Sequence, residues 1–306
     1  MKSGIACKDS PMRHFRAVAT ALCLLAVLAL PQGAGAERVT SQAPPALGAE
    51  TAAEALFRAG LAEQRAQAVG AEAELFADRM ARLYLTHGSS PDWRAEVARI
   101  HDPARVSALF LGAIEAQLTP ALIDDPALGP ALGATGVSTE TEGRGLELAA
   151  RIELTRPGAL SAAALRLGRD QKRGAVSLAA LRALLNVTDP VPQMVAARLN
   201  REVAFARGFA AADGFEFPVT PDDIAADLML QLREIRTETR MRTELTYHAA
   251  FAPLGVAAID RIAAARRDPA AQRLDALMAR IESEVLEQLA AETGRAAARR
   301  LKGTAL

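Results

Sequence analysis

Five places along the chain carry the same signal for the start of a helix, a capping residue directly before a proline. The side-chain oxygen of a capping residue accepts a hydrogen bond from a free backbone N–H in the first turn, and proline fits the first helical position because it lacks that N–H. The pairs are Ser90-Pro91, Asp102-Pro103, Asp189-Pro190, Thr220-Pro221 and Asp268-Pro269. We therefore predict that a helix begins at each of these prolines.

Apolar residues between these signals recur at helical spacing, three or four positions apart, with charged residues elsewhere on the helical wheel. The stripe nearest the C-terminus consists of Leu274, Leu277, Ile281, Val285 and Leu289. A second stripe, in residues 191–210, consists of Val195, Leu199, Val203 and Ala206 with Phe205 and Phe209 beside it, and Arg198, Arg201 and Arg207 are expected to face solvent. Both patterns predict amphipathic helices.

The composition points in the same direction. Hydrophobic residues make up 50% of the chain but aromatic residues only 4%, which favours a core of Leu, Ala and Val and close packing of helices over sheets. Earlier helices are expected within residues 51–85, 92–101 and 103–118. The sequence thus predicts an all-α fold, a multi-helix bundle of amphipathic, Ala/Leu-rich helices.

Residues 1–36 have the organisation of a secretory signal peptide. Arg13 and Arg16 precede an apolar run at 17–30, and the small-residue sequence Gly33-Ala34-Gly35-Ala36 follows it. A positively charged start, a short apolar segment and a small-residue exit are the features that the export machinery and signal peptidase recognise. We expect cleavage after Ala36 and a periplasmic location.

Two alternatives to a cleaved signal disagree with particular residues. A membrane anchor needs about 20 apolar residues, and the segment 31–36 interrupts the run before that length. A lipid-attached cysteine needs a small residue before it, whereas Cys23 follows a leucine. Since Cys7 also lies in the leader, the mature chain is expected to have no disulfide. Both Met1 and Met12 are compatible with a start of translation.

The expected mature chain divides into segments of different composition. Residues 37–49 contain adjacent prolines and are expected to form a disordered lead-in. Residues 50–118 form an N-terminal helical part, residues 119–145 a hinge rich in proline and glycine, and residues 146–306 a C-terminal helical part. The sequence leaves open whether the two helical parts share one core.

The charge balance excludes one class of partner. The chain has 36 basic and 36 acidic residues, so its formal net charge is zero. Proteins that bind nucleic acids depend on a net basic face, because their affinity comes largely from phosphate contacts. We therefore expect no nucleic-acid partner.

Three histidines follow the leader, and none has a metal-binding spacing such as His-Glu-x-x-His. His101 and Asp102 could act as a base with its orienting acid, but Asp102 is explained by its capping position. His87 precedes a Gly-Ser-Ser turn and is expected to close a helix, where its charge suits the helix dipole. His248 lies beside Tyr247, and the sequence offers no third group for catalysis by this pair.

Other candidate motifs also have structural explanations. Neighbouring residues on a helix point in different directions, so neither Asp124-Asp125 nor Asp222-Asp223 forms a bidentate metal site. We expect the first pair in solvent and the second in the first turn of a helix, where negative charge is favourable. The turn at 133–136 lacks the lysine of a phosphate loop, and Ser89-Ser90 has no nucleophile-elbow context.

Arginines gather on one predicted helix, where they could attract anionic lipid. They are Arg233, Arg236, Arg240 and Arg242. Glu234, Glu238 and Glu244 interleave with them, which favours a solvated helix face held together by ion pairs.

Three segments carry a resemblance to a known family. They are Trp93 with Arg99-Ile100-His101-Asp102-Pro103-Ala104-Arg105, the segment 199–209, and Phe251-Ala252-Pro253-Leu254 leading into a helix broken at Pro269. Together they resemble the domain of unknown function 2059 family, whose members are exported all-helical proteins of Gram-negative bacteria. The family's usual aromatic residue before the break and glycine after it are replaced by Ala265 and Ala271. The resemblance implies a fold and an exported location, and it implies no activity or ligand.

These observations together predict a periplasmic binding or envelope-associated module that acts on an envelope protein or a small ligand. No catalytic residue, cofactor site or metal site is assigned, and no transmembrane segment is expected in the mature chain. A hydrolase whose site is assembled from distant residues and an amphipathic protein that docks on lipid remain alternatives. Convergence of His101, His248 or an acid pair in one cleft would favour the enzyme.

Overall fold

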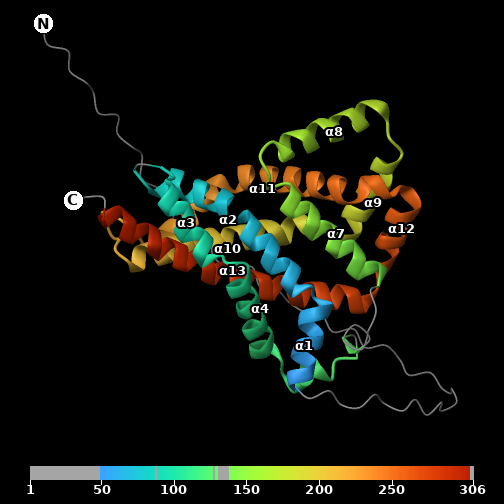
Figure 1. The fold of residues 1–306 in the computed structure, drawn as a ribbon, viewed down its shortest axis with the longest axis horizontal. Coiled ribbons are helices and arrows are strands. Elements are labelled where there is room, and N and C mark those ends of the chain that lie inside the picture. Colours follow the sequence, from blue (N-terminus) through green and yellow to red (C-terminus); the bar gives the residue numbers. More distant parts are fainter. Residues whose placement is uncertain (1–48, 87, 127, 130–137, 304–306) are drawn as a thin grey trace, which may run out of the picture. The chain divides into compact units, whose positions relative to one another are not determined.

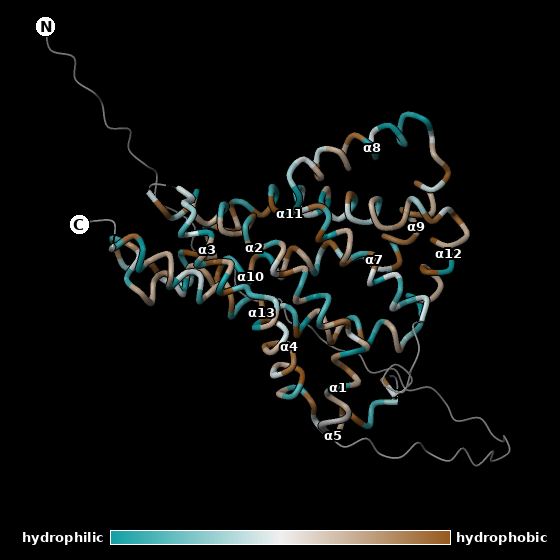
Figure 2. Tube along the Cα trace, in the orientation of Figure 1, coloured by the Kyte–Doolittle hydropathy of each residue, from teal (hydrophilic) through white to brown (hydrophobic). Residues whose placement is uncertain are grey.

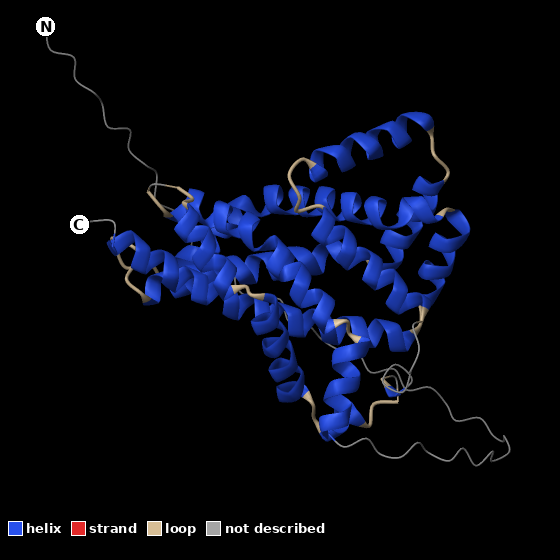
Figure 3. Cartoon of the chain, viewed as in Figure 1, coloured by secondary structure: helices blue, strands red, loops and turns tan. Residues whose placement is uncertain are grey.

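The computed structural model describes residues 49–86, 88–126, 128–129 and 138–303. Every regular element in these ranges is a helix (Figures 1 and 3), which confirms the prediction of an all-α bundle. Each helix carries both hydrophobic and hydrophilic residues along its length (Figure 2), as expected for amphipathic helices. The expected signal peptide, the lead-in up to residue 48, His87 and the turn at 133–136 lie outside the described residues.

The helices expected between residues 50 and 118 are present. They are α1 (Ala49–Ala59), α2 (Ala62–Tyr84), α3 (Pro91–Ile100) and α4 (Pro103–Gln117). The turn between α1 and α2 passes through Leu61, whose φ of 54° is left-handed. The short helix α5 (Pro120–Ile123) and the start of α7 (Thr139–Glu153) lie within the expected hinge, so both ends of that segment are helical.

Helices also fill the C-terminal part. They are α8 (Ala159–Arg173), α9 (Ser177–Thr188), α10 (Pro190–Ala211), α11 (Pro221–Phe251), the 3-10 turn η1 (Ala252–Leu254), α12 (Val256–Ala265) and α13 (Pro269–Gly303). Helix α9 has no start signal in the sequence, because the residue before it is Val176, whose side chain makes no capping hydrogen bond.

All five predicted helix starts are confirmed, although their caps differ. Ser90 and Asp102 each accept a hydrogen bond from the backbone N–H three residues later, at 3.2 and 3.0 Å. Thr220 takes part in a reciprocal capping box, and Asp268 accepts a bond from the N–H two residues later at 2.7 Å. Asp189 is the exception, because its side chain makes no capping hydrogen bond.

One hydrophobic cluster joins the two helical parts. It contains Trp93 and Phe110 from the N-terminal part and Phe205 and Ile281 from the C-terminal part, and all four are fully buried. The predicted apolar stripe of α13 belongs to the same cluster. The indole N–H of Trp93 donates to the carbonyl oxygen of Ala77 at 2.8 Å. The two helical parts therefore share a core.

Two glycines allow α10 and α13 to pack closely. A Cβ placed on Gly208 would collide with the backbone of Ala291, and one on Gly294 would collide with the carbonyl oxygen of Phe205. Because the clashing atoms are backbone rather than flexible side chains, the two helices would have to separate to accept alanine at either glycine.

A partly buried ion-pair network links α2, α7 and α13. Arg151 donates to both carboxylate oxygens of Glu72 at 3.1 Å and to Glu282 at 3.0 Å, and Arg65 also pairs with Glu282. Burial by itself raises the pKa of Glu282, but the charges of Arg151 and Arg65 together outweigh it and lower that pKa to about 2. We call these four residues the Arg151 network.

The expectation that three arginines of α10 face solvent is wrong for two of them. Arg207 is exposed. Arg198 is only 20% exposed and pairs with Glu238 of α11 at 2.7 Å. Arg201 lies over the ring of Phe76, 4.8 Å from its centroid, and burial lowers the pKa of its guanidinium. The reason is that α10 packs against both α11 and α13, which cover more of its surface than one apolar stripe indicates.

Candidate functional site

His101 is a core residue rather than part of an exposed catalytic pair. It is 4% exposed at the end of α3, and its Nδ1 lies 3.0 Å from the carbonyl oxygen of Val97. Its ring packs against Phe76 with centroids 5.6 Å apart. Burial lowers the pKa of His101 to about 4, so the ring is neutral at pH 7. The neighbouring Asp102 is engaged as the cap of α4.

His248 has a partner that the sequence did not reveal. Its Nε2 lies 3.0 Å from Oδ2 of Asp170 on α8, and the residue is 5% exposed. Tyr247 belongs to a different set of contacts. Its hydroxyl oxygen lies 3.2 Å from Oγ1 of Thr188 and accepts a hydrogen bond from Nη1 of Arg266, also at 3.2 Å. Burial raises the pKa of Tyr247, so its hydroxyl stays protonated. The pair of His248 and Asp170 thus connects α8 to α11.

The two acid pairs serve the ends of helices and an ion pair. Asp222 and Asp223 lie in the first turn of α11, where Asp223 completes the capping box. Asp124 ends α5, while Asp125 accepts a hydrogen bond from Arg273 at 3.0 Å and its side chain is 17% exposed. The expectation that this pair is solvated is therefore wrong for Asp125. The described residues contain no group of three or more His, Cys, Asp or Glu side chains placed to hold a metal ion.

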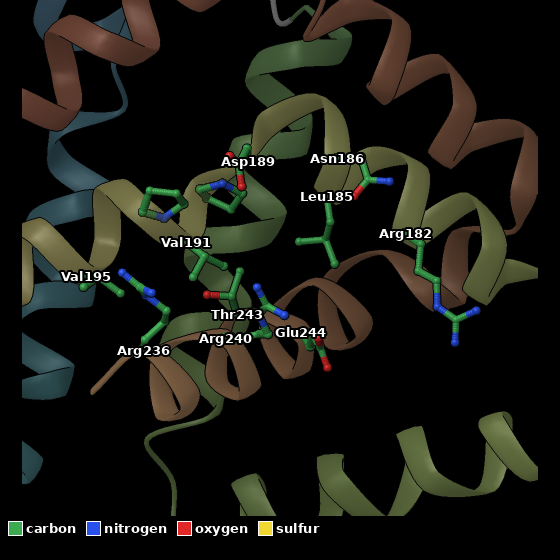
Figure 4. A pocket seen from close by; sticks show the side chains of 12 residues that line it. Arg182, Leu185, Asn186, Asp189, Val191, Val195, Arg236, Arg240, Thr243 and Glu244 are labelled. Atoms are coloured by element: carbon green, nitrogen blue, oxygen red, sulfur yellow. The ribbon is translucent and has the colours of Figure 1, made fainter. Parts of the chain in front are cut away.

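A groove of about 660 Å³ lies where α9, the first turns of α10 and the middle of α11 meet (Figure 4). We call it the α9–α11 groove. Its charged lining residues are Arg182, Asp189, Arg236, Arg240 and Glu244. It contains neither His101 nor His248, and neither acid pair. The residues that sequence inspection considered for catalysis therefore do not converge there.

The corner of the groove is formed by Asp189, where α9 passes into α10 without a loop. Its φ of 33° and ψ of 58° are left-handed. Few residues other than glycine adopt a positive φ, and the residue before a proline favours extended backbone, so this turn is strained. Because the side chain of Asp189 caps neither helix, its carboxylate remains at the lining of the groove.

The cationic wall of the groove comes from two helices. Arg236 and Arg240 are one turn apart on α11, which places their Cβ atoms about 5–6 Å from each other. Figure 4 shows both side chains extending from α11 toward the first turn of α10, with Arg182 on α9 farther along. None of the three has an ion pair with another described residue, and all three are exposed. Their guanidinium groups are available to a ligand.

The expected ion pairs within α11 do not form among the described residues. Of the three interleaved glutamates, only Glu238 makes an ion pair, and its partner is Arg198 of α10. The physical reason is that α10 lies against α11 and brings Arg198 within 2.7 Å of that carboxylate. Arg233, Arg236 and Arg240 of α11 are thereby left exposed to the solvent or to the groove.

The opposite wall of the groove is apolar. Val195 is 5% exposed, and Leu185 and Val191 are half-buried. Pro190 and Pro192, in the first turn of α10, also line the groove. Prolines have no backbone N–H, so this helix start offers fewer donors than most.

The lining of the groove has the chemistry of an anion-binding site. The groove has unpaired guanidinium groups beside apolar side chains, but no histidine, cysteine, serine or tyrosine lines it. The lining groups that could act as a nucleophile or a base are the hydroxyl of Thr243 and the carboxylates of Asp189 and Glu244. Guanidinium groups recognise carboxylates and phosphates through paired hydrogen bonds, so an acidic ligand fits this chemistry.

No family model, curated protein or solved structure matches this chain. The resemblance to the domain of unknown function 2059 family stays a prediction. Among the described helices, none combines the length and the apolar character needed to cross a bilayer.

The sequence pointed to part of the groove only. Arg236 and Arg240 were recognisable as a cationic stripe, because residues four apart share a helix face. Arg182 and Asp189 gave no signal, since their link to that stripe depends on how α9 packs against α11. The only local sign was the left-handed backbone of Asp189, which a sequence motif does not reveal.

Proposed function

We propose that this chain is a non-catalytic binding module of the bacterial envelope, which holds an acidic ligand in the α9–α11 groove. The observation that carries the proposal is that Arg182, Arg236 and Arg240 line one cavity beside an apolar wall. Export to the periplasm is part of the proposal. It is supported by the basic, apolar and small-residue segments of residues 1–36 and by the family resemblance.

The size and chemistry of the groove support a small ligand. Its volume of about 660 Å³ falls within the range of about 300–1,000 Å³ found for small-molecule sites. The three arginines attract an anion, and the apolar wall excludes water from part of the ligand. Because these arginines form no ion pairs with described residues, binding would not have to break one.

The contacts of the histidines support binding over hydrolysis. His101 is buried against Phe76, and burial holds its pKa near 4. His248 is engaged with Asp170 of α8. Neither residue lines the groove, so neither histidine is placed there to act as a general base.

The proposal can be tested by calorimetric titration of the purified protein with succinate, inorganic phosphate and decanoate at low ionic strength. The groove variant would combine Arg182→Gln, Arg236→Gln and Arg240→Gln. The charge-matched control would combine Arg207→Gln, Arg261→Gln and Arg295→Gln, which are exposed arginines outside the groove.

We expect at least one probe to bind, with affinity reduced tenfold or more in the groove variant and little changed in the control. Binding of none of the probes, or an equal loss in both variants, would contradict the proposed function. Circular dichroism of each variant would establish that its helices are intact.

The export part of the proposal has its own measurement. Protein isolated from the periplasmic fraction of the producing bacterium should begin at Glu37, as determined by N-terminal sequencing or intact mass. A mature protein that retains residues 22–30 would contradict cleavage after Ala36.

A further inference from the structure

We propose that the ligand of the α9–α11 groove is an aliphatic monoanion, a molecule with one acidic head group and a hydrocarbon chain. This inference rests on the proposed function and specifies its ligand class. The head group would bind Arg236 and Arg240, and the chain would lie along Leu185, Val191 and Val195.

The position of the head group follows from the cationic wall. Arg236 and Arg240 lie on the same face of α11, so their guanidinium groups can contact one carboxylate or phosphate together. Thr243, one turn nearer the apolar wall, does not compete for the head group. Its hydroxyl already donates to the carbonyl oxygen of Thr239 at 2.8 Å, so its proton is not free to bind the head group.

The apolar wall disfavours a compact polar anion. Phosphate sites at the start of a helix use free backbone N–H groups. Here Pro190 and Pro192 occupy the first and third positions of α10 and remove two of those donors. The side chains that replace them are apolar, and a hydrocarbon chain gains affinity from covering such a surface.

Two carboxylates favour one acidic head group over two. Asp189 stands at the corner of the groove, and Glu244 lies one turn beyond Arg240 on α11. A second anionic group at the far end of a ligand would meet one of these like charges. Arg182 is the remaining lining cation, so the preference for a monoanion holds for ligands whose far end meets Asp189 or Glu244 instead.

The test is a calorimetric series with acetate, hexanoate, decanoate and sebacate, the last being the dicarboxylate with the same number of carbons as decanoate. We expect affinity to rise with chain length, by up to about fourfold for each buried methylene. We expect sebacate to bind at least tenfold more weakly than decanoate. Equal affinity for acetate and decanoate would overturn the aliphatic inference and leave the proposed function standing.

Three variants separate the head group from the chain. Arg240→Met should weaken all four probes, because it removes the charge and keeps a side chain of similar length. Val191→Ser should weaken decanoate and leave acetate unchanged, since only the longer chain reaches that wall. Arg295→Met on α13 is the matched control and should leave the affinities for decanoate and for acetate unchanged. Decanoate binding that is insensitive to both groove variants would overturn the inference.

Discussion

Replacing Arg151 by methionine removes the residue that joins the carboxylates of the Arg151 network. Glu72 would lose its only hydrogen-bonding partner among the described residues, while Glu282 would keep Arg65. Methionine keeps much of the length of the arginine stem, so the main change is the lost charge. The variant therefore leaves Glu72 without a hydrogen-bonding partner among the described residues, and only the charges of Arg201 and Arg242 then stabilise its carboxylate.

The expected magnitude follows from the pKa of Glu282. Arg151 and Arg65 together hold that pKa at about 2, against an ordinary 4.5, which corresponds to about 3 kcal/mol of stabilisation of the charged form, and Arg65 keeps its share in the variant. Breaking a buried ion pair by removing one partner costs about 3–5 kcal/mol. We expect Arg151→Met to lower the free energy of unfolding by about 3–5 kcal/mol.

Urea denaturation at pH 7, followed by circular dichroism and by the fluorescence of Trp93, measures this loss. Adding Glu72→Gln to Arg151→Met should recover about 1–3 kcal/mol, because it removes the orphaned charge. The control is Arg156→Met, since Arg156 and Glu153 form an exposed pair on the surface. Its effect should stay within about 0.5 kcal/mol.

A loss below about 1 kcal/mol for Arg151→Met would refute this reasoning. The same conclusion would follow if Glu72→Gln made the Arg151→Met variant less stable. Either result would mean that solvent, rather than Arg151, stabilises the two carboxylates.

Three further predictions concern the core. Burial lowers the pKa of His101 to about 4 in the folded chain, so its contribution to the free energy of unfolding is complete above about pH 6.5 and is lost as the pH falls toward 4. Urea titrations should show this loss as about 3 kcal/mol. The His101→Leu variant should not show it. Gly294→Ala should cost at least about 1–3 kcal/mol by forcing α10 and α13 apart, whereas Gly145→Ala, where a Cβ meets nothing, should stabilise α7 by about 0.5–1 kcal/mol in thermal melts. Leu277→Ala should lower the free energy of unfolding by about 2–5 kcal/mol, because Leu277 is buried. Leu230→Ala, at an 85% exposed position, should lower it by less than about 0.5 kcal/mol. Equal losses would contradict the assigned core.

Local signals made most of the helices predictable. The cap at Ser90 and the capping box at Thr220 depend on residues within one turn, so the sequence contains all the information that they need. The stripe of α13 was predictable for the same reason, since helical spacing alone defines it. Helix α9 was not, because its start has no capping side chain and its burial comes from α11 and α12.

Long-range packing explains what the sequence did not reveal. Arg201 looks like a solvent-facing residue on the wheel of α10, yet it lies over Phe76 of α2. His248 and Asp170 are 78 residues apart and meet because α8 lies on α11. The α9–α11 groove combines three helices in the same way, so Arg236 and Arg240 were visible in the sequence as a stripe, whereas their position beside Arg182 and the apolar wall was not.

Methyl NMR of the protein with labelled Val and Leu side chains, titrated with decanoate, tests the binding groove most directly. The account predicts that the largest chemical-shift changes fall on Leu185, Val191 and Val195 and disappear in Arg240→Met. Changes centred instead on Leu277 and Val285 of the core, or no change at any methyl group at millimolar decanoate, would contradict it.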